Sequence, residues 1–330
     1  MLPQTMNAIE ITKGGGPEVL KPATRPVPHP GDGQVLIKVA YAGINRHDCG
    51  QRKRGFPPKG ATDIPGLEVS GEVAAVGGNV TRFKPGDKVC ALVNGGGYAE
   101  YCIALQEVTF PIPAGYDMKL AAGLPEALMT AWMNVFMIGN LKAGQWLLVH
   151  GGSSGVGSIA IQLAHLVGAK VVTTVGNAAK RDFCLKLGAQ AAINYREQDF
   201  VAEVAKVTNG HGADVILDMA GTQYAKRNLE ALAMDGVIAH LSAGDGSDYA
   251  VPLSAIMGKR ARVSGSQLRA SSLPTKVEIV RQLNDRVWPH LGPKVTPCID
   301  TVLPLARACD GHARMEGSEH IGKIFLQCHS

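Results

Sequence analysis

The chain has no long, uninterrupted run of apolar residues. Its most apolar window, residues 121–138, contains Pro125, Glu126 and Asn134. A buried helix therefore explains this window better than a membrane span, which needs about 20 consecutive apolar residues. The N-terminal stretch MLPQTMNAIE has no basic region followed by an apolar core, so it gives no sign of a secretory signal peptide. We expect a protein without a membrane segment.

Paired cysteines and clusters of basic residues are also missing. The seven cysteines are scattered, and none forms a Cys-x-x-Cys pair. This pattern is typical of a reducing cytosol and argues against a disulfide framework. The formal net charge is only +5, with no lysine or arginine run to follow a nucleic-acid backbone. We therefore expect a cytoplasmic protein that binds a small anionic ligand and no nucleic acid.

The sequence does have a glycine-rich turn between two apolar segments. Residues 146–157 read WLLVHGGSSGVG, an apolar run followed by glycines at 151, 152, 155 and 157, and a mostly apolar, helix-like stretch comes next. Such a strand–turn–helix unit binds a pyrophosphate, because glycines let the backbone approach the phosphates and the helix start offers free N–H groups. The spacing is not Gly-x-Gly-x-x-Gly, so the turn alone fits a plain strand–helix connection equally well.

The residues after this turn decide between these alternatives. Apolar runs at 171–175, 191–195, 214–219 and 237–241 each follow a helix-like stretch, which is the rhythm of βαβ units in a parallel sheet. Before residue 118, short alternating segments separated by glycine and proline predict a mostly β region. A chain of 330 residues is long enough for two domains. We predict an α/β protein with a doubly wound, dinucleotide-binding parallel sheet.

The end of the second strand of this sheet indicates which dinucleotide binds. NAD-specific sites place an acidic residue there, on the adenosine ribose. Here the strand ends in Gly176 and Asn177, and Lys180 and Arg181 follow. A 2′-phosphate meets no repelling carboxylate and finds a cation nearby, so we predict NADPH over NADH. The alternative is that the two basic residues are solvent-exposed residues at the start of a helix, without a role in binding.

A series of short motifs spans nearly the whole chain. They are GGPEVL (15–20), GINRHD (43–48), IPGLEVSGEVAAVG (64–77), KPGDKV (84–89), GGYAEY (96–101), LPEALMTAW (124–132), VHGGSSGVG (149–157) and HIGKIFL (320–326). In this order the chain resembles the medium-chain dehydrogenase/reductase superfamily, and within it the zinc-free quinone oxidoreductases, including the p53-inducible type. The resemblance implies a GroES-like, mostly β substrate domain at 1–125 and 266–330. It also implies a Rossmann domain at 126–265, an active-site cleft, and NADPH as reductant.

Two residues that bind catalytic zinc in related dehydrogenases are replaced here. Asn45 stands where those relatives have a cysteine and Leu67 where they have a histidine, while Glu68 remains. Residues 89–101 also leave no room for the four-cysteine lobe of those relatives. A zinc site needs three or four protein ligands, so we expect no bound metal.

Without zinc to polarise a carbonyl, the acceptor has to be electrophilic already. We predict NADPH-dependent hydride transfer to a small quinone, with the protein supplying position, exclusion of water and hydrogen-bond donors. An enone or 2-enoyl thioester reductase is the alternative among enzymes, since the same donor and cleft suit it. A nucleotide-binding protein recruited for structure or RNA binding is the alternative outside them. No RNP-like aromatic motif or arginine-rich arm supports the last reading.

The resemblance also implies individual site residues. The expected catalytic residues at the cleft are Asn45, as donor to a substrate oxygen, Asp48, Phe56 and Ser154. Relatives often have a tyrosine where this chain has Phe56. A phenylalanine only packs or stacks, so proton transfer from a tyrosine at this position is excluded. The expected cofactor-binding residues are Thr130, Gly152, Ser153, Ser154, Gly155, Val156, Gly157, Gly176, Lys180, Arg181, Tyr195 and Lys323.

Subunit assembly follows from the same resemblance. Relatives pair the edges of their nucleotide-binding sheets. The apolar strands expected at 237–241 and 261–266 are the segments that suit such pairing, so we expect a homodimer.

Overall fold

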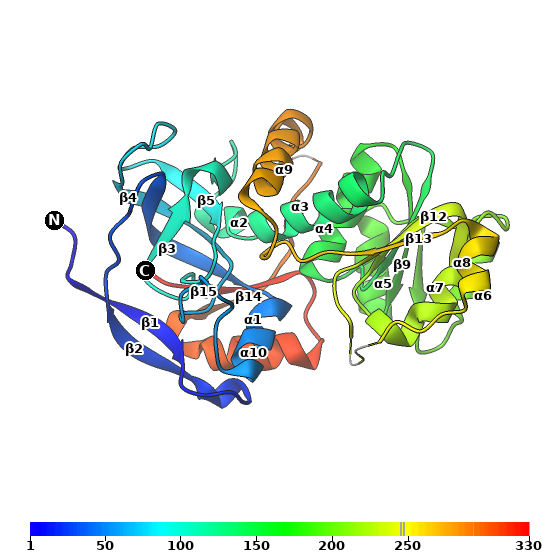
Figure 1. Ribbon diagram of the computed structural model, residues 1–330, viewed down its shortest axis with the longest axis horizontal. Helices are drawn as coiled ribbons and strands as arrows, with labels where there is room; N and C mark the ends of the chain where they lie inside the picture. Colours follow the sequence, from blue (N-terminus) through cyan, green and yellow to red (C-terminus); the bar gives the residue numbers. More distant parts are fainter. Residues whose placement is uncertain (245, 247, 293, 330) are drawn as a thin grey trace. The chain divides into compact units, whose positions relative to one another are not determined.

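The computed structural model describes residues 1–244, 246, 248–292 and 294–329 (Figure 1). The chain divides into two compact units. The first consists of Met1–Glu126, Lys276–Val280 and Thr296–Ser330, and the second of Ala127–Thr275 and Arg281–Val295. Each unit has its own sheet structure and its own hydrophobic core.

The first unit is built mainly from antiparallel strands. Its elements in chain order are β1 (Thr5–Ile11), η1 (Pro17–Val19), β2 (Leu20–Pro26), β3 (Gln34–Ile44), α1 (Arg46–Arg54), β4 (Glu68–Val76), β5 (Lys88–Leu92), β6 (Tyr101–Leu105), η2 (Gln106–Val108), β7 (Thr109–Pro111), α2 (Met118–Ala121), β14 (Ile299–Pro304), η6 (Leu305–Arg307), α10 (Ala308–Gly317) and β15 (Lys323–Gln327). A seven-stranded sheet has the order β14-β15-β3-β4-β5-β7, with β6 paired to the first half of β3. The strands β1 and β2 form a separate antiparallel pair.

The long strand β3 is the centre of this sheet because its side chains are almost all apolar. Val35, Leu36 and Ile37 are fully buried, and β3 pairs with β4, β6 and β15. The C-terminal strand β15, drawn in red in Figure 1, therefore lies beside β3 although it is far from it in sequence. The predicted mostly β first region is confirmed.

The second unit contains a parallel sheet with helices between successive strands. Its elements are α3 (Pro125–Ala131), η3 (Trp132–Ile138, a π-helix), β8 (Trp146–His150), α4 (Gly155–Leu166), β9 (Lys170–Val175), α5 (Ala178–Lys186), β10 (Ala191–Asn194), α6 (Phe200–Val207), β11 (Ala213–Asp218), η4 (Gly221–Tyr224), α7 (Ala225–Ala231), β12 (Leu232–His240), α8 (Leu253–Lys259), β13 (Arg262–Gly265), α9 (Leu273–Arg286, of which 276–280 group with the first unit) and η5 (Trp288–His290). The strand order is β10-β9-β8-β11-β12-β13, and all neighbours are parallel.

This order is that of a doubly wound dinucleotide-binding sheet, which confirms the predicted fold class. The order reverses between β8 and β11, and ligands of such sheets bind outside the carboxyl ends of the strands at that point. The predicted strands at 171–175, 191–195 and 214–219 correspond to β9, β10 and β11 within one or two residues.

Two details of the second unit differ from the sequence prediction. The helix-like stretch before the predicted strand 237–241 is shorter than expected: α7 ends at Ala231, because its C-cap Leu232 has an extended backbone (φ −73°, ψ 142°) and already begins β12. The expected edge segment 237–241 is an interior strand, since β12 lies between β11 and β13. Among the described residues, β13 is the edge strand on this side of the sheet.

The second unit also extends further along the chain than the predicted 126–265. Residues 266–275 and 281–295 group with it. Ser266 donates to the side chain of Asn134 at 2.7 Å, and Trp132 donates to the side chain of Gln282 at 2.7 Å, which ties these segments to η3. Among the described residues, no helix combines the length and apolar character needed to cross a bilayer.

Candidate functional site

The turn between β8 and α4 has no space for side chains at two of its glycines. A Cβ atom on Gly152 would lie 2.0 Å from Oγ1 of Thr173, and one on Gly157 would lie 2.4 Å from the carbonyl oxygen of Gly151. Gly151 has a φ of 73°, a conformation that favours glycine. Ser154 is the N-cap of α4, where its Oγ accepts the N–H of Gly157 at 3.0 Å. Positions 152 and 157 therefore require glycine, and the backbone of the turn carries no side chain there.

The turn residues predicted to hold a pyrophosphate lie together at the carboxyl end of β8. Gly152 and Ser153 are buried, and Gly155 and Val156 in the first turn of α4 are half-buried. A helix of twelve residues has unpaired N–H groups and the positive end of its dipole at this position. The arrangement favours an anion here.

The end of β9 carries no carboxylate. Gly176 and Asn177 follow the strand, and the Asn177 side chain caps α5 by accepting the N–H of Lys180 at 2.9 Å. A Cβ atom on Gly176 would lie 3.0 Å from the hydroxyl of Tyr195, so Tyr195, which directly follows β10, lies beside the end of β9. Tyr195 is itself exposed.

The two basic residues of α5 have different surroundings. Lys180 is buried, with 9% of its surface exposed, so it is not the freely solvated residue that the alternative reading required. Arg181 is exposed and forms an ion pair with its neighbour Asp182 at 3.1 Å. Of the two, Lys180 is the buried cation, and it lies in the first turn of the helix that follows β9.

Asn45, Glu68 and Lys323 form a buried polar cluster in the first unit. Nζ of Lys323 donates to Oδ1 of Asn45 at 2.7 Å and to the carboxylate of Glu68, and Nδ2 of Asn45 donates to that carboxylate at 3.0 Å. The second carboxylate oxygen of Glu68 accepts the N–H of Glu126 at 3.0 Å. The side chains of Glu68 and Lys323 are 0% and 4% exposed, so the charge of each is balanced by the other.

Strand register brings the three residues together. Asn45 follows the last residue of β3, Glu68 begins β4 and Lys323 begins β15. In the sheet, Glu68 pairs with Gly43 and Ile324 pairs with Ile44, so all three side chains meet at one end of three adjacent strands. From the sequence we expect Lys323 to contact the cofactor. In the structure its ammonium donates to Glu68 and Asn45. Within the described part of the chain, no group of three or more His, Cys, Asp or Glu side chains is placed to hold a metal ion.

Asp48 is fully buried in a hydrogen-bond network. Its carboxylate accepts the N–H groups of Asn45 at 2.8 Å and Gly66 at 3.2 Å, and the hydroxyl of Tyr98 at 3.3 Å. The same hydroxyl lies 3.0 Å from Nε2 of His312. Through these contacts Asp48 fixes the backbone at the start of α1. They give no support to its expected catalytic role.

The network continues from α10 back to α1. Nη1 of Arg52 lies 3.4 Å from Nδ1 of His312, and its Nη2 pairs with Glu316 at 2.9 Å. Nε of Arg52 donates to the carbonyl oxygen of Gly15 at 3.0 Å. Burial and the adjacent guanidinium lower the pKa of His312 to about 3, so the imidazole is neutral.

The remaining predicted site residues differ in exposure. The ring of Phe56 is 61% exposed and available for stacking. Thr130 is buried in α3, where its carbonyl oxygen accepts the amide of Asn134 at 2.9 Å. The hydroxyl of Ser154 is used as the cap of α4. Trp132 is buried and stacks on Phe136 with ring centroids 4.5 Å apart, so it packs in the core.

A row of polar side chains crosses the carboxyl edge of the parallel sheet. His150 at the end of β8 contacts Thr174 of β9 at 3.0 Å and Asn228 of α7 at 2.8 Å. The amide of Asn228 donates to Asp218 at the end of β11 at 2.9 Å, and the same oxygen of Asp218 lies 3.1 Å from Nδ1 of His240 at the end of β12. The row therefore follows the strand order β9-β8-β11-β12.

His240, the last member of this row, lines a pocket of about 500 Å³ in the second unit. The pocket is formed by the carboxyl ends of β12 and β13 and by residues after β11. Thr222, Tyr249 and Gln267 are among its other lining residues. It lies on the edge of the sheet where ligands of this fold bind.

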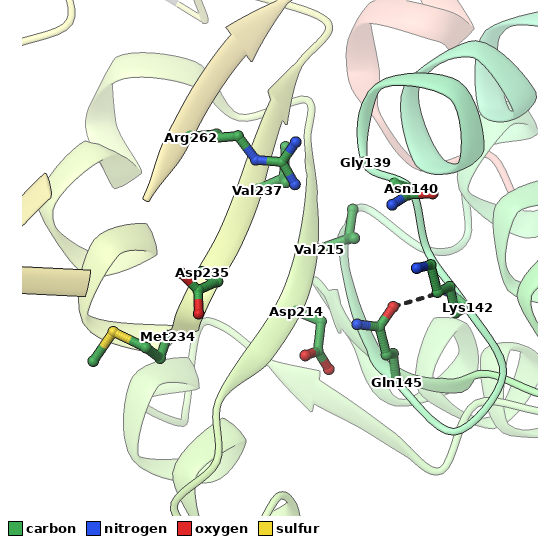
Figure 2. A pocket seen from close by; sticks show the side chains of 10 residues that line it. All are labelled: Gly139, Asn140, Lys142, Gln145, Asp214, Val215, Met234, Asp235, Val237 and Arg262. Atoms are coloured by element: carbon green, nitrogen blue, oxygen red, sulfur yellow. Dashed lines mark hydrogen bonds between the residues drawn. The ribbon is translucent and has the colours of Figure 1, made fainter. Parts of the chain in front are cut away.

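A second, smaller pocket lies at the opposite edge of the same sheet. Figure 2 shows Gln145, Asp214 and Arg262 around a cavity of about 100 Å³, with Gln145 accepting the backbone N–H of Lys142 at 2.8 Å. Asp214 and Arg262 stand at the amino ends of β11 and β13. Parallel sheets bind their ligands at the other edge, so this pocket is not the candidate site.

Sequence reasoning missed Asp218 and His240, although the chain contains a signal for them. Apolar runs of the repeat end in a polar residue, in LLVH at 147–150, VILD at 215–218 and VIAH at 237–240. In a parallel sheet these positions meet at the carboxyl edge. The network of Tyr98 and His312 had no comparable signal, because more than 200 residues separate its two members.

Comparison with known proteins agrees with this arrangement. A family model described as alcohol dehydrogenase GroES-like domain matches residues 31–114, and one described as zinc-binding dehydrogenase matches residues 155–282. The quinone oxidoreductase of Sus scrofa is 32% identical over 313 residues and covers 93% of each chain. This relative spans both units.

Solved structures give the same result. The Escherichia coli quinone oxidoreductase complexed with NADPH has a TM-score of 0.86 at 27% identity, covering 97% of this chain and 99% of that one. An NAD-dependent alcohol dehydrogenase has a TM-score of 0.86 at 31% identity, covering 98% and 99%. The sequence resemblance, the GroES-like first region and the Rossmann sheet are thereby confirmed. The chain belongs to the medium-chain dehydrogenase/reductase superfamily, among relatives that bear the name quinone oxidoreductase.

Proposed function

We propose that the protein reduces small quinones by hydride transfer from NADPH, without zinc. The observation that carries this proposal is the β8–α4 turn, where added Cβ atoms on Gly152 and Gly157 would come within 2.0 and 2.4 Å of neighbouring atoms. Such close packing leaves bare backbone and a helix start, which suits a pyrophosphate. The similar Escherichia coli quinone oxidoreductase carries NADPH, which supports the choice of dinucleotide.

The residues that would hold NADPH fall into three groups. The backbone of Gly152, Ser153, Ser154, Gly155, Val156 and Gly157 suits the pyrophosphate. Gly176, Lys180, Arg181 and Tyr195 surround the end of β9, and the absence of a carboxylate among the residues there favours a 2′-phosphate. Thr130 and Lys323 are the proposed contacts of the nicotinamide half. When bound, NADPH supplies the hydride.

Zinc independence is supported by the buried cluster in the first unit. The ammonium of Lys323 bonds to both Asn45 and Glu68, which stand at two of the three positions that hold catalytic zinc in related dehydrogenases. A cation is therefore already paired with the remaining acidic residue. Without a Lewis acid the substrate must delocalise the incoming charge itself, as a quinone does.

Asn45 and Phe56 are the proposed contacts of the substrate. Both ends of the Asn45 amide are engaged, by Glu68 and by Lys323, so it binds a quinone oxygen only by exchanging one of these bonds. The exposed ring of Phe56 suits stacking against a flat quinone. Enones and 2-enoyl thioesters are the second candidate substrates, because they too accept a hydride without a metal.

Initial rates of NADPH and NADH oxidation test this proposal. We expect rapid turnover with NADPH and a small ortho-naphthoquinone, and little with NADH. NADPH binding without quinone turnover, together with reduction of an enone or 2-enoyl thioester, would replace the quinone by the second substrate class. If neither nucleotide binds, the interpretation of the β8–α4 turn is wrong.

The proposed assembly is a homodimer that pairs β13 with its copy. As the last strand of its sheet, β13 has one unpaired edge, and Val263 on it is partly exposed. Unpaired strand edges are templates for pairing with another chain. We place the protein in the cytoplasm because all seven cysteines are free thiols, as a reducing compartment keeps them.

A further inference from the structure

Asp218 determines which nitrogen of His240 carries the hydrogen, and His240 lines the pocket of about 500 Å³ described above. One oxygen of the fully buried Asp218 accepts the N–H groups of Ala220 at 2.6 Å and Gly221 at 3.0 Å. The other accepts the amide of Asn228 at 2.9 Å and lies 3.1 Å from Nδ1 of His240. Burial raises the pKa of Asp218, but its hydrogen bond with His240 and the nearby His150 outweigh this and lower the pKa overall.

An ionised Asp218 has only acceptors, so Nδ1 of His240 carries the hydrogen and Nε2 is left for another partner. Nε2 is buried, and no described residue forms a hydrogen bond with it. The titratable groups that face His240 are Asp218, the buried His150 behind Asp218, and Tyr249, whose ring meets the imidazole edge-on with centroids 4.7 Å apart. Buried polar atoms without a protein partner are rare and usually have a ligand, a water or a chemical role.

His240 is the last residue of β12, and this place in the strand order indicates which part of a dinucleotide lies near it. The end of the second strand, here β9, receives the adenosine ribose. The nicotinamide half then belongs to the other half of the sheet, β11 to β13, whose carboxyl ends form the pocket. A substrate that receives hydride has to be in contact with the nicotinamide, so its reacting oxygen lies within the same region.

The reduction also needs a proton. A hydride supplies two electrons and one hydrogen, and converts a quinone to a hydroquinone anion, which takes up one proton to become the hydroquinone. Phe56 has no proton to give, Asp48 is engaged by Asn45, Gly66 and Tyr98, and the hydroxyl of Ser154 donates to Sδ of Met219 at 3.7 Å. The expected catalytic residues therefore leave the proton unassigned.

We propose that His240, held by Asp218, is the proton donor of this reduction and thus a further catalytic residue. The proposal rests on the function proposed above. In the step, the Nε2–H bond of protonated His240 breaks and an O–H bond forms on the hydroquinone anion. The neutral imidazole then recovers a proton from water through the pocket. Asp218 stabilises the cationic form and keeps the ring oriented, as carboxylates do behind catalytic histidines.

His240→Gln tests the proposal, and His211→Gln is the matched control. His211 is exposed and lies next to the amino end of β11, where it pairs with Asp214 at 3.0 Å. We expect His240→Gln to lower kcat at pH 7 by about 100-fold, the usual contribution of a general acid, and to remove the alkaline limb of the kcat–pH profile. The Kd for NADPH, measured by fluorescence, stays within about threefold because the residue serves the acid step. Added imidazole should partly restore kcat in His240→Ala.

A second readout does not depend on turnover. In protein labelled with ¹³C at histidine Cε1, the resonance missing from His240→Gln should shift in the wild type when NADP⁺ and a hydroquinone are added together. The proposal is overturned if kcat of His240→Gln stays within about threefold of wild type, or if only its Kd for NADPH changes. Failure of the wild type to bind NADPH would instead overturn the proposed function.

Discussion

The guanidinium of Arg52 lies 3.4 Å from Nδ1 of His312, and this contact determines where the buried imidazole carries its hydrogen. Arginine has only donors, so Nδ1 accepts and Nε2 bears the hydrogen. Nε2 then donates to the hydroxyl of Tyr98 at 3.0 Å, which in turn donates to Asp48 at 3.3 Å. The direction of every bond in this network follows from one guanidinium.

The first prediction concerns the pH dependence of stability. In the folded protein burial and Arg52 lower the pKa of His312 to about 3, whereas an exposed histidine titrates near 6.5. Below about pH 6.5 the unfolded chain binds a proton that the folded chain does not, so this stabilisation is present at neutral pH and is lost as the pH falls. The free energy of unfolding should drop by about 1.4 kcal/mol per pH unit from this group.

Urea unfolding at pH 7.5 and 5.5 measures this effect. We expect His312→Gln to be less stable than wild type at pH 7.5 and the difference to shrink at pH 5.5. His29→Gln, at an exposed position, is the control and should follow the wild type at both values. A constant difference between His312→Gln and wild type would contradict the neutral, buried imidazole.

The second prediction concerns the ion pair between Glu68 and Lys323. The two side chains are 0% and 4% exposed, so Lys323→Met leaves a buried carboxylate held only by Asn45 and a backbone N–H. Breaking a buried pair in this way costs about 3–5 kcal/mol, whereas replacing both partners by apolar residues is often neutral. Lys323→Met should therefore be strongly destabilised, and Lys323→Met/Glu68→Leu should recover part of the loss, because it removes the unpaired charge but also the acceptor of the Asn45 amide and the Glu126 N–H.

Thermal and urea unfolding of both variants, compared with the wild type, test this prediction. The two variants differ only at Glu68, so the comparison gives the cost of its unpaired charge less that of the two hydrogen bonds it accepts from Asn45 and Glu126. A single variant as stable as the wild type would mean that water reaches Glu68 and that the cluster is not a closed site. A double variant no better than the single one would mean that the loss arises from packing and not from charge.

The sequence was sufficient to predict the parallel sheet because its pattern is local. Each strand is a short apolar run after a helix-like stretch, and 191–195 was placed within one residue of β10. The end of β12 was predicted well, but its first residues were not, because the register of β12 against β11 shifts between Leu232 and Val237, where Asp235 has a φ of 62° that Asp adopts only in some contexts.

The site was less predictable because its contacts cross long sequence distances. Asn45 and Lys323 were both named, yet their hydrogen bond joins residues 278 positions apart and depends on the register of β15 against β3. The same holds for Asp48, whose partners come from separate loops and from α10 by way of Tyr98. Turn chemistry identifies such residues as polar and conformationally special, but only the sheet register decides which ones meet.

The third prediction concerns the choice between NADPH and NADH. Asn177→Asp keeps the cap of α5, because Asp caps a helix as well as Asn does, and it places a carboxylate directly after β9. We expect the affinity for NADPH to fall by about tenfold relative to NADH, since an acid at this position binds a ribose and repels a 2′-phosphate. Fluorescence titration with each nucleotide measures the ratio.

Asn209→Asp is the control for the added charge. Asn209 is an exposed residue after α6, on the side of the sheet from which β11 begins. Its substitution should leave the NADPH to NADH ratio unchanged. If the NADPH to NADH ratio is also unchanged in Asn177→Asp, the 2′-phosphate does not bind at the end of β9, and Lys180 does not have its proposed role.

The last prediction concerns the free edge of β13. If two copies pair along this strand, Val263→Arg places two like charges close together across the two-fold axis, and like charges opposite each other destabilise strand pairing. Val263 is 38% exposed, so a single chain tolerates the arginine, while the pair does not. Light scattering should give the mass of a dimer for the wild type and of a monomer for Val263→Arg. Leu185→Arg, a comparable change at a 42% exposed position in α5, should remain dimeric. The prediction is wrong if the wild type is a monomer at working concentration or if Val263→Arg stays dimeric. Either result would mean that β13 does not form a dimer interface.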